Sequence, residues 1–366
     1  MACRTTRRLL FGLATAAMTL VAATTRAETV SDVCRLSPHQ TNGPASSAPD
    51  ICATIDVAAA NGTPRIVDVA RAVDELANAA DQSDFVLLGE IHDNPSHHRI
   101  RSQILLAMAA LRAKAKRGPP ALVLEHIRAD QALAVAGFRA VDRVSRRATA
   151  EFFSAVDWKR SGWPDEGMFR PLIDAALDAE WPILHGNLAR EAVRSVAKRG
   201  VSAVDPEEGQ RLGLETHLPD AAQSGLLDEL VASHCGLMPR TSLATMADAQ
   251  RYRDAYMASR LVDAANTHHG AVLLAGNGHV RSDRGVPWHL NRLAPGKRTL
   301  VVIFAQAASD HADALAYVER GPNGSPLADY VVVTPRVERP DPCLAMKRRL
   351  STPPKPDVRP GAPKKH

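Results

Sequence analysis

The stretch GEIHDNPSHH, residues 89–98, places a carboxylate, three imidazoles and a second acid within ten residues. Polar groups also end three other apolar runs, in LEH (124–126), HGN (185–187) and GNGH (276–279). Glutamate and histidine bind divalent metals and act as general acids and bases. We therefore predict one site at these run ends, formed by Glu90, His92, Glu125, His126 and His279.

The apolar runs that precede these groups are predicted to be strands buried on both faces. They lie at 85–91, 121–126, 182–187, 271–280, 299–305 and 330–335. Helical patterns lie between most of them, which predicts an α/β fold with a mostly parallel sheet and helices on both faces, a three-layer sandwich. The carboxyl ends of parallel strands meet at one edge, so the polar groups are expected to share a cleft there.

The domain organisation follows from one long connection. About 80 residues separate Leu188 from Gly270 without a convincing strand, which predicts a small all-helical subdomain inserted at 201–269. The α/β domain would then comprise 65–200 and 270–335. A Cys-containing extension, 28–64, would precede it, and a tail rich in proline and lysine, 336–366, is predicted to be disordered.

The first residues are typical of an export signal. Arg4, Arg7 and Arg8 precede an apolar run, and Thr25-Arg26-Ala27 offers a cleavage site, so residues 1–27 are predicted to be a signal peptide cut near Ala27. The adjacent arginines leave both the general and the twin-arginine export routes open. The apolar run is too short to span a membrane, and the protein is expected to be periplasmic or secreted.

Charge and cysteines limit the possible partners. The net charge is +5, but the signal carries +4 and residues 335–366 carry +6, which leaves −5 for the middle and predicts no nucleic-acid partner. Four cysteines remain after the signal. Cys34 could pair with Cys52 and Cys235 with Cys343, although three pairings are possible and unpaired thiols are an alternative.

Several motifs together resemble one family. They are GEIHDNPSHH, LEH, HCGLMP (234–239), AQRYRDAYMA (249–258) and LLAGNGHVRSDRGVP (273–287). In this order they are similar to the ChaN family of haem-binding uptake proteins, which belongs to the Tiki superfamily with TraB-like and erythromycin-esterase-like proteins. The resemblance runs from about residue 66 to residue 335. It implies an α/β domain with a small helical domain, and non-covalent haem binding between them.

For function, the resemblance implies bacterial haem acquisition, a possible homodimer around haem, and an outer-membrane haem receptor or a periplasmic haem carrier as partner. Members are commonly lipoproteins with a tyrosine iron ligand. This sequence lacks the lipidation cysteine and has Phe169 near the place of that tyrosine. The residues proposed to contact haem are His92, Trp163, Phe169, Tyr252, Tyr256 and Arg281.

The same superfamily implies an alternative, a metal-dependent hydrolase of esters or peptides. Glu90 and His279 would be its catalytic groups. A divalent metal such as Mn, Co or Zn would be held by Glu90, His92, Glu125, His126 and His279. A third possibility is an inert cleft in a protein that acts through partners. The sequence has no Gly-x-Ser-x-Gly elbow and no Cys-x-x-Cys-His haem attachment motif.

Overall fold

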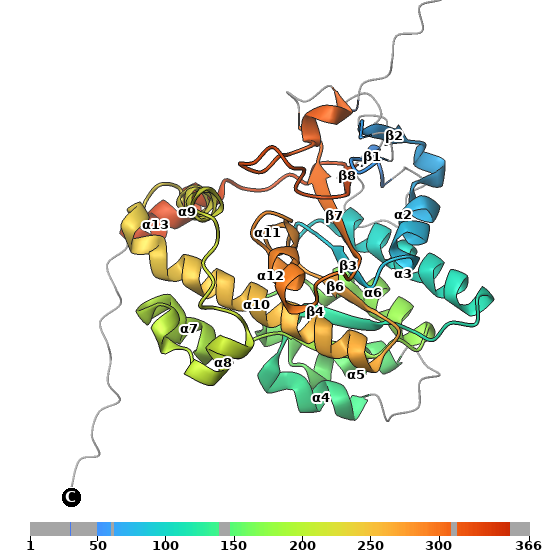
Figure 1. The fold of residues 1–366 in the computed structure, drawn as a ribbon, viewed down its shortest axis with the longest axis horizontal. Helices are drawn as coiled ribbons and strands as arrows, with labels where there is room; N and C mark the ends of the chain where they lie inside the picture. The colour runs from blue at the N-terminus through green and yellow to red at the C-terminus, as the bar shows by residue number, and fades with distance from the viewer. Residues whose placement is uncertain (1–29, 31–49, 60–61, 139–146, 309–312, 352–366) are drawn as a thin grey trace, which may run out of the picture.

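The computed structural model describes residue 30 and residues 50–59, 62–138, 147–308 and 313–351 (Figure 1). In these residues an 8-stranded sheet has the order β2-β1-β8-β7-β3-β6-β4-β5. The strands are β1 (Ala53–Asp56), β2 (Arg65–Val67), β3 (Phe85–Leu88), β4 (Ala121–Arg128), β5 (Ile183–Asn187), β6 (Ala271–Leu274), β7 (Thr299–Gln306) and β8 (Tyr330–Thr334). All pairs from β8 to β5 are parallel, whereas β1 runs antiparallel to β2 and β8. The predicted mostly parallel sheet is confirmed.

The sequence predicts neither β1 nor β2. β1 lies within 28–64 and pairs with β8, so this segment contributes a strand to the sheet. The two strands have only 4 and 3 residues, and two of the three residues of β2 are exposed. Strands this short contain too few residues to show the apolar alternation from which a strand is predicted.

Two predicted strands end earlier in the structure. β3 ends at Leu88 rather than at residue 91, and β6 ends at Leu274 rather than at residue 280. After β6, Gly276 is the N-cap of the short helix α11 (Asn277–Val280), which carries His279. Gly89 and Gly276 therefore lie where the chain leaves the sheet after β3 and β6.

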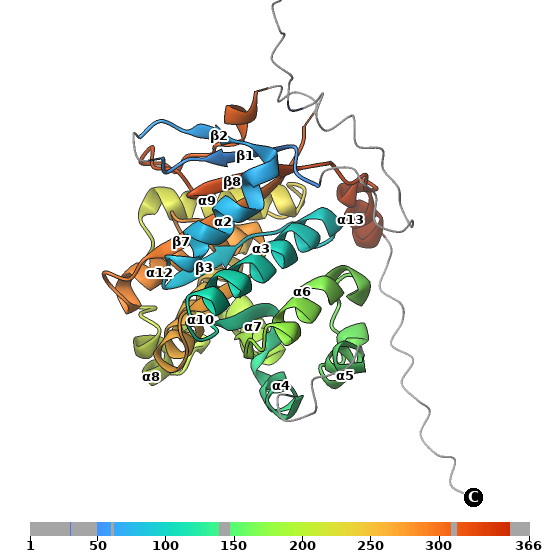
Figure 2. The ribbon, with the colours of Figure 1, turned by 90° about the vertical axis from the view of Figure 1, so that its right-hand side faces the viewer.

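Helices cover both faces of the sheet, as the sequence predicts (Figures 1 and 2). Successive strand residues point to opposite faces. Val86 and Leu88 contact one helical layer, while Phe85 and Leu87 contact the other. The first layer contains α2 (Ala72–Asp81), α3 (Pro95–Lys114), α5 (Arg147–Ala155) and α6 (Glu166–Asp178), and the second contains α10 (Ala244–Thr267) and α12 (Val286–Leu293).

Residues 188–270 are all described and contain helices but no strand. They are α7 (Arg190–Arg199), α8 (Pro206–Arg211), α9 (Asp220–Ser233) and α10. The first half of α10 packs with α7 through Tyr252 and Val196, and its second half packs on the sheet through Met257 and Leu261. We call residues 188–270 the helical segment. One continuous helix, α10, packs both on the rest of this segment and on the sheet and so joins the two.

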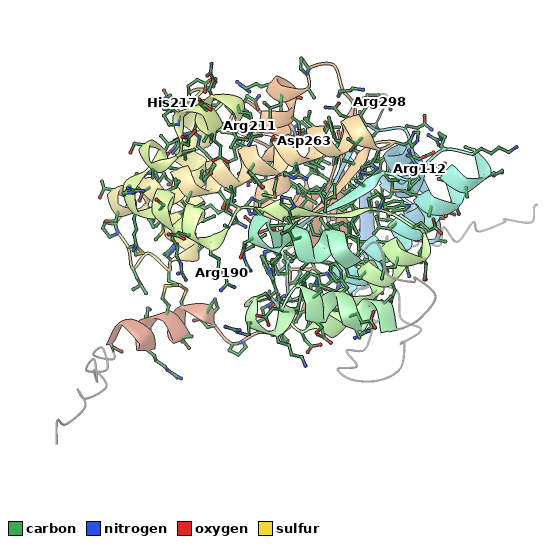
Figure 3. All side chains as sticks on the ribbon, turned by 90° about the horizontal axis from the view of Figure 1, so that it is seen from below. Arg112, Arg190, Arg211, His217, Asp263 and Arg298 are labelled. Atoms are coloured by element: carbon green, nitrogen blue, oxygen red, sulfur yellow. A yellow bond between two sulfur atoms is a disulfide. The ribbon has the colours of Figure 1, made fainter. Side chains whose placement is uncertain are left out.

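The C-terminal segment corrects one prediction. Residues 342–351 form helix α13 (Pro342–Ser351), so the predicted disorder of 336–366 is wrong for this part, and residues 352–366 lie outside the described residues. A disulfide between Cys235 and Cys343 ties α13 to the end of α9 (Figure 3). Cys52 is also disulfide-bonded, and Cys34, the partner that the sequence suggests, lies outside the described residues.

A buried histidine in α12 predicts acid sensitivity. His289 is 1% exposed, and its Nε2 atom has no hydrogen-bond partner among the described residues. Burial lowers the pKa of His289 to about 3, below the value of about 6.5 expected in the unfolded chain. Below about pH 6.5 the unfolded chain therefore binds a proton that the folded chain excludes. His289 alone therefore lowers the free energy of unfolding by about 1.4 kcal/mol for each pH unit of acidification, until about pH 3.

We expect His289→Phe to flatten the acid side of the stability curve by about this slope, because phenylalanine does not titrate and fills a similar volume. Urea unfolding at about pH 7, 6 and 5 measures the free energy of unfolding of both proteins. Equal slopes in the two proteins would show that folding does not lower the pKa of His289.

Candidate functional site

Side chains alternate between the two faces of the sheet along each strand, so a residue's position determines which helical layer its side chain meets. Glu90 lies two residues after Leu88, and His126 lies two residues after Leu124, so both point toward the layer of α3 and α6. Glu125 has the opposite phase and meets Arg253 of α10. The strand ends thus carry two groups of side chains, the Glu90 group on the α3 side and the Glu125 group on the α10 side.

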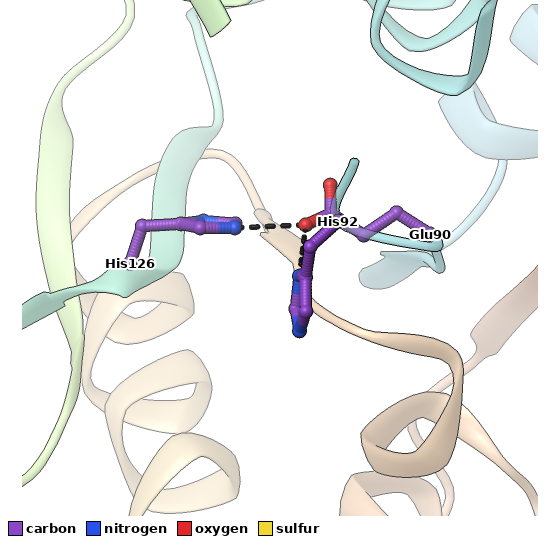
Figure 4. A group of neighbouring side chains, drawn as sticks. All are labelled: Glu90, His92 and His126. Atoms are coloured by element: carbon purple, nitrogen blue, oxygen red, sulfur yellow. Dashed lines mark hydrogen bonds and ion pairs between the residues drawn. The ribbon is translucent and has the colours of Figure 1, made fainter. Parts of the chain in front are cut away.

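The Glu90 group is a carboxylate held by three donors, two of which, His92 and His126, are drawn in Figure 4. His92 donates from Nδ1 to Oε1 of Glu90 at 2.5 Å, and His126 donates from Nε2 to the same oxygen at 2.8 Å. The guanidinium of Arg101, from α3, pairs with the other oxygen, and neither Glu90 nor Arg101 has exposed side-chain surface. Ligand atoms of Glu90, His92 and His126 all lie within 4.8 Å of one another, a spacing that could hold a metal ion.

His92 is the member of this group that reaches the surface, with 37% of its side chain exposed. Burial lowers the pKa of His92, and the Glu125 carboxylate only partly opposes this, so the ring is neutral near pH 7. Because Nδ1 carries the proton donated to Glu90, Nε2 has the lone pair. Nε2 points toward Gly276, where a Cβ atom would lie 3.1 Å away. A carboxylate on one ring nitrogen is the usual support of a metal-binding histidine.

Aromatic rings form the wall behind this group. Trp163 packs against His92 with ring centroids 4.9 Å apart and against His126 at 4.6 Å, and its Nε1 donates to the carbonyl of His126 at 3.0 Å. Phe169 lies 4.6 Å from the His126 ring and is 3% exposed. Two of the predicted haem contacts are in this wall. Trp163 lies beside His92, whereas Phe169 is buried behind His126.

The Glu125 group is centred on His279. Its Nε2 lies 3.2 Å from Oε1 of Glu125, and its Nδ1 pairs with the carboxylate of Asp254. Burial favours a neutral ring, but the two carboxylates outweigh it and raise the pKa of His279 to about 9. Burial also raises the pKa of Glu125, but His279 and Arg253 hold it well below its usual value. The raised pKa therefore favours a cationic His279 between Glu125 and Asp254 at neutral pH.

We expect His279 to be doubly protonated at neutral pH and to lose its proton only near pH 9. This raised pKa stabilises the fold fully below about pH 6.5, and the contribution is lost as the pH rises through about 9. NMR of protein labelled with ¹⁵N-histidine distinguishes protonated from unprotonated ring nitrogens. One unprotonated His279 nitrogen at pH 7 would contradict this assignment.

The two tyrosines of α10 are not part of either group. Tyr252 is 3% exposed and packs among the residues of the helical segment, and Tyr256 lies 3.1 Å from Nε2 of His185 through its hydroxyl. The side of α10 that meets the site instead presents Arg253 and Asp254. The face of α10 that carries Tyr252 and Tyr256 therefore packs on α7 and β5.

Arg281, the remaining predicted haem contact, is held by acids. Its guanidinium bonds Asp283 at 2.9 and 3.0 Å and lies 3.8 Å from Glu229 and 3.6 Å from Glu319. These contacts tie the loop after α11 to α9 and to residue 319. The acidic partners of Arg281 thus give it a structural role beside the site.

Two residues of α3 at the site were not predicted from the sequence, the buried Arg101 and His98. Arg101 donates to Nδ1 of His98 at 2.7 Å as well as pairing with Glu90, and His98 donates to the carbonyl of His92 at 2.8 Å. His97 points away and bonds the Ile91 amide and Thr334 instead. Of the two adjacent histidines in the first turn of α3, His98 therefore contacts the site and His97 does not.

Comparisons with known proteins identify the family and the fold. A model of the family described as "Haem-binding uptake, Tiki superfamily, ChaN" matches residues 76–290. The chain belongs to this family. A solved structure described as cofacial haem binding to ChaN of Campylobacter jejuni is 19% identical, with a TM-score of 0.55, covering 78% of this chain and 97% of that one. This likeness shows that the two share a fold.

Two more distant structures were also found. A type III effector is 14% identical with a TM-score of 0.38, covering 72% of this chain and 94% of that one. An erythromycin esterase mutant in its open conformation is 14% identical with a TM-score of 0.35, covering 75% of this chain and 80% of that one. Among curated proteins no match was found. The ChaN family is thus the relationship on which the functional argument can rest.

Proposed function

We propose that this ChaN-family chain binds haem non-covalently at the strand-end edge, with Nε2 of His92 as the iron ligand. The observation that carries the proposal is the Glu90–His92 pair, which leaves the lone pair on an exposed, neutral ring. Trp163 packs against His92 and offers an apolar ring suited to a porphyrin face. The family description supports haem as the ligand.

The residues fit a histidine ligand better than a tyrosine ligand. Tyr252 and Tyr256 face the helical segment, and Phe169 has no oxygen. Bound haem would supply an iron that accepts the Nε2 lone pair. This chain would hold the ring in place through Glu90 and would exclude water with Trp163.

We further infer that the protein works outside the cytoplasm in bacterial haem acquisition. The signal-like residues 1–27 support export, and the disulfide between Cys235 and Cys343 is the kind of bond that persists in an oxidising compartment. Within the described part of the chain, every helix is too short or too polar to cross a membrane. An outer-membrane haem receptor, a periplasmic haem carrier or a second copy of the chain would be its partner.

Absorbance titration tests the haem proposal. The mature chain from Glu28 onward is titrated with haemin and, separately, with iron-free protoporphyrin IX. Iron ligation predicts a saturable Soret shift with haemin and clearly weaker binding of protoporphyrin. Phe169→Tyr should leave the haemin spectrum unchanged, because residue 169 is buried behind His126. Equal binding of both porphyrins, or no saturable shift, would contradict the proposal.

A metal-dependent hydrolase is the second candidate, favoured by the spacing of Glu90, His92 and His126. His126 supports it further, because its buried Nδ1 atom has no hydrogen-bond partner among the described residues. His279, the base that the sequence suggested, is a cation and would donate rather than accept a proton. Metal analysis after dialysis against Mn, Co or Zn, with ester and peptide probes, tests this candidate. Bound metal with turnover that is lost in His126→Phe would support it.

A further inference from the structure

A strap leaves the sheet beside the site, formed by residues 335–343. It begins directly after β8, where the side-chain amide of Asn94 approaches Oγ1 of Thr334 at 3.3 Å and the carbonyl of Pro335 at 3.5 Å. It ends in the first turn of α13, at Cys343. The strap lies outside residues 76–290, the part of the chain that the family model matches.

The first anchor of the strap is Arg339. Its guanidinium makes two hydrogen bonds of 2.6 Å to the carboxylate of Asp93 and one of 2.8 Å to Oε1 of Gln306 at the end of β7. Asp93 directly follows His92, so the strap fixes the turn that positions the proposed iron ligand. The pair is solvent-accessible, with 30% of Arg339 and 46% of Asp93 side-chain surface exposed.

The second anchor is the disulfide between Cys343 and Cys235, which follows α9 (Figures 1 and 3). α9 contacts the other side of the site, since its Glu229 pairs with Arg284 in the loop after His279. The strap therefore joins the His92 turn to the helical segment across the strand-end edge. Both cysteines are half-buried, which leaves the bond open to an attacking thiolate.

We propose that this strap is a redox-controlled latch on the strand-end site. With the disulfide closed, both ends are held and the His92 turn is fixed. A dithiol reductant opens it by thiol–disulfide exchange: two electrons pass to the bond, Cys235 and Cys343 become thiols, and the reductant becomes a disulfide. That the site beneath the latch holds haem rests on the proposed function, whereas the latch itself does not.

The relative strength of the two anchors explains why the disulfide would control the strap. An exposed ion pair favours its closed geometry by a factor of about five at most, which corresponds to about 1 kcal/mol. While the disulfide is closed, Arg339 lies only four residues from a fixed point, and tethering raises its effective concentration near Asp93. Once the bond is broken, only the hydrogen bonds of Arg339 to Asp93 and Gln306 hold the far part of the strap, which then opens more frequently.

The test compares the mature chain with Cys235→Ser/Cys343→Ser, which removes the latch without leaving a free thiol. Hydrogen exchange followed by mass spectrometry is measured first, without haem. We expect exchange of the Ile91 and Asn94 amides, which donate to Nδ1 of His97 and to the carbonyl of Ile91, to become about tenfold faster, with β3 and β6 unchanged. Adding Arg339→Gln should open the strap further, whereas Arg336→Gln, whose only ion pair among the described residues is with Glu338, should not.

The second readout is the rate at which haemin leaves for excess apomyoglobin. We expect release about fivefold faster or more from the serine variant, and from the native chain after treatment with a phosphine reductant. Unchanged exchange at Ile91 and Asn94 would overturn the latch, as would faster exchange throughout β3 and β6, which indicates general destabilisation. Faster local exchange in a chain that binds no haemin would support the latch and reject the haem proposal.

Discussion

His92→Ala is expected to lower haemin affinity by more than about 100-fold, the largest effect of any single change at the site. Loss of a group that only supports a ligand costs about 10- to 100-fold, and loss of the ligand itself should cost more. Glu90→Gln, which weakens the bond to Nδ1 of His92 but leaves Nε2 in place, should fall within the 10- to 100-fold range. Soret titration measures both.

His185→Ala is the matched control for this prediction. His185 also lies near a strand end, in β5, but its Nε2 faces the hydroxyl of Tyr256 rather than the Glu90 group. Its removal should leave haemin affinity unchanged. Equal losses in His92→Ala and His185→Ala would mean that the spectral change reports general damage rather than iron ligation.

Arg101→Met is expected to destabilise the fold by about 3–5 kcal/mol, because it leaves the carboxylate of Glu90 buried without its cationic partner. Neither side chain has exposed surface, so water cannot replace the lost charge. Guanidinium unfolding at neutral pH measures the free energy of unfolding. The double variant Arg101→Met/Glu90→Gln should recover part of the loss, since it removes the unpaired charge.

Arg99→Met on the same helix is the control. Arg99 pairs with Asp50, but 46% of its side chain is exposed, so its loss should cost less than about 1 kcal/mol. Similar losses for the two arginines would contradict the view that Arg101 is the buried counter-charge of the site.

Apolar patterning predicted the sheet well, because strands buried on both faces leave continuous runs of Val, Leu and Ile. It also predicted that Glu90, His92, Glu125, His126 and His279 would gather at one edge, and the structure places all of them there. The division into two groups depends on strand phase and on the irregular pairing of β4 with β5 after Leu124. The apolar pattern of the sequence does not predict an irregularity of this kind.

The haem contacts proposed on α10 show a different limit. A spacing of four predicts correctly that Tyr252 and Tyr256 share a helix face, but it does not say which neighbour this face meets. The AQRYRD motif carries the informative residues, Arg253 and Asp254, which pair with Glu125 and His279.

Arg101 and the C-terminal strap could not be predicted because both depend on contacts distant in sequence. Arginine in an amphipathic helix is ordinarily exposed, and only the position of Glu90 at the end of β3 makes burial of Arg101 favourable. The segment 336–351 is rich in proline and charge, which indicates disorder. The disulfide of Cys343 with Cys235 and the bonds of Arg339 to Asp93 order it instead.

The central claim is that Nε2 of His92 binds haem iron. Electron–nuclear double resonance of the haemin-loaded chain, labelled with ¹⁵N-histidine, tests it most directly. The account predicts a strong ¹⁵N coupling from one axial histidine that disappears in His92→Ala and persists in His185→Ala. A spectrum without histidine coupling, or with a coupling that survives in His92→Ala, would place the iron on another ligand and contradict the account.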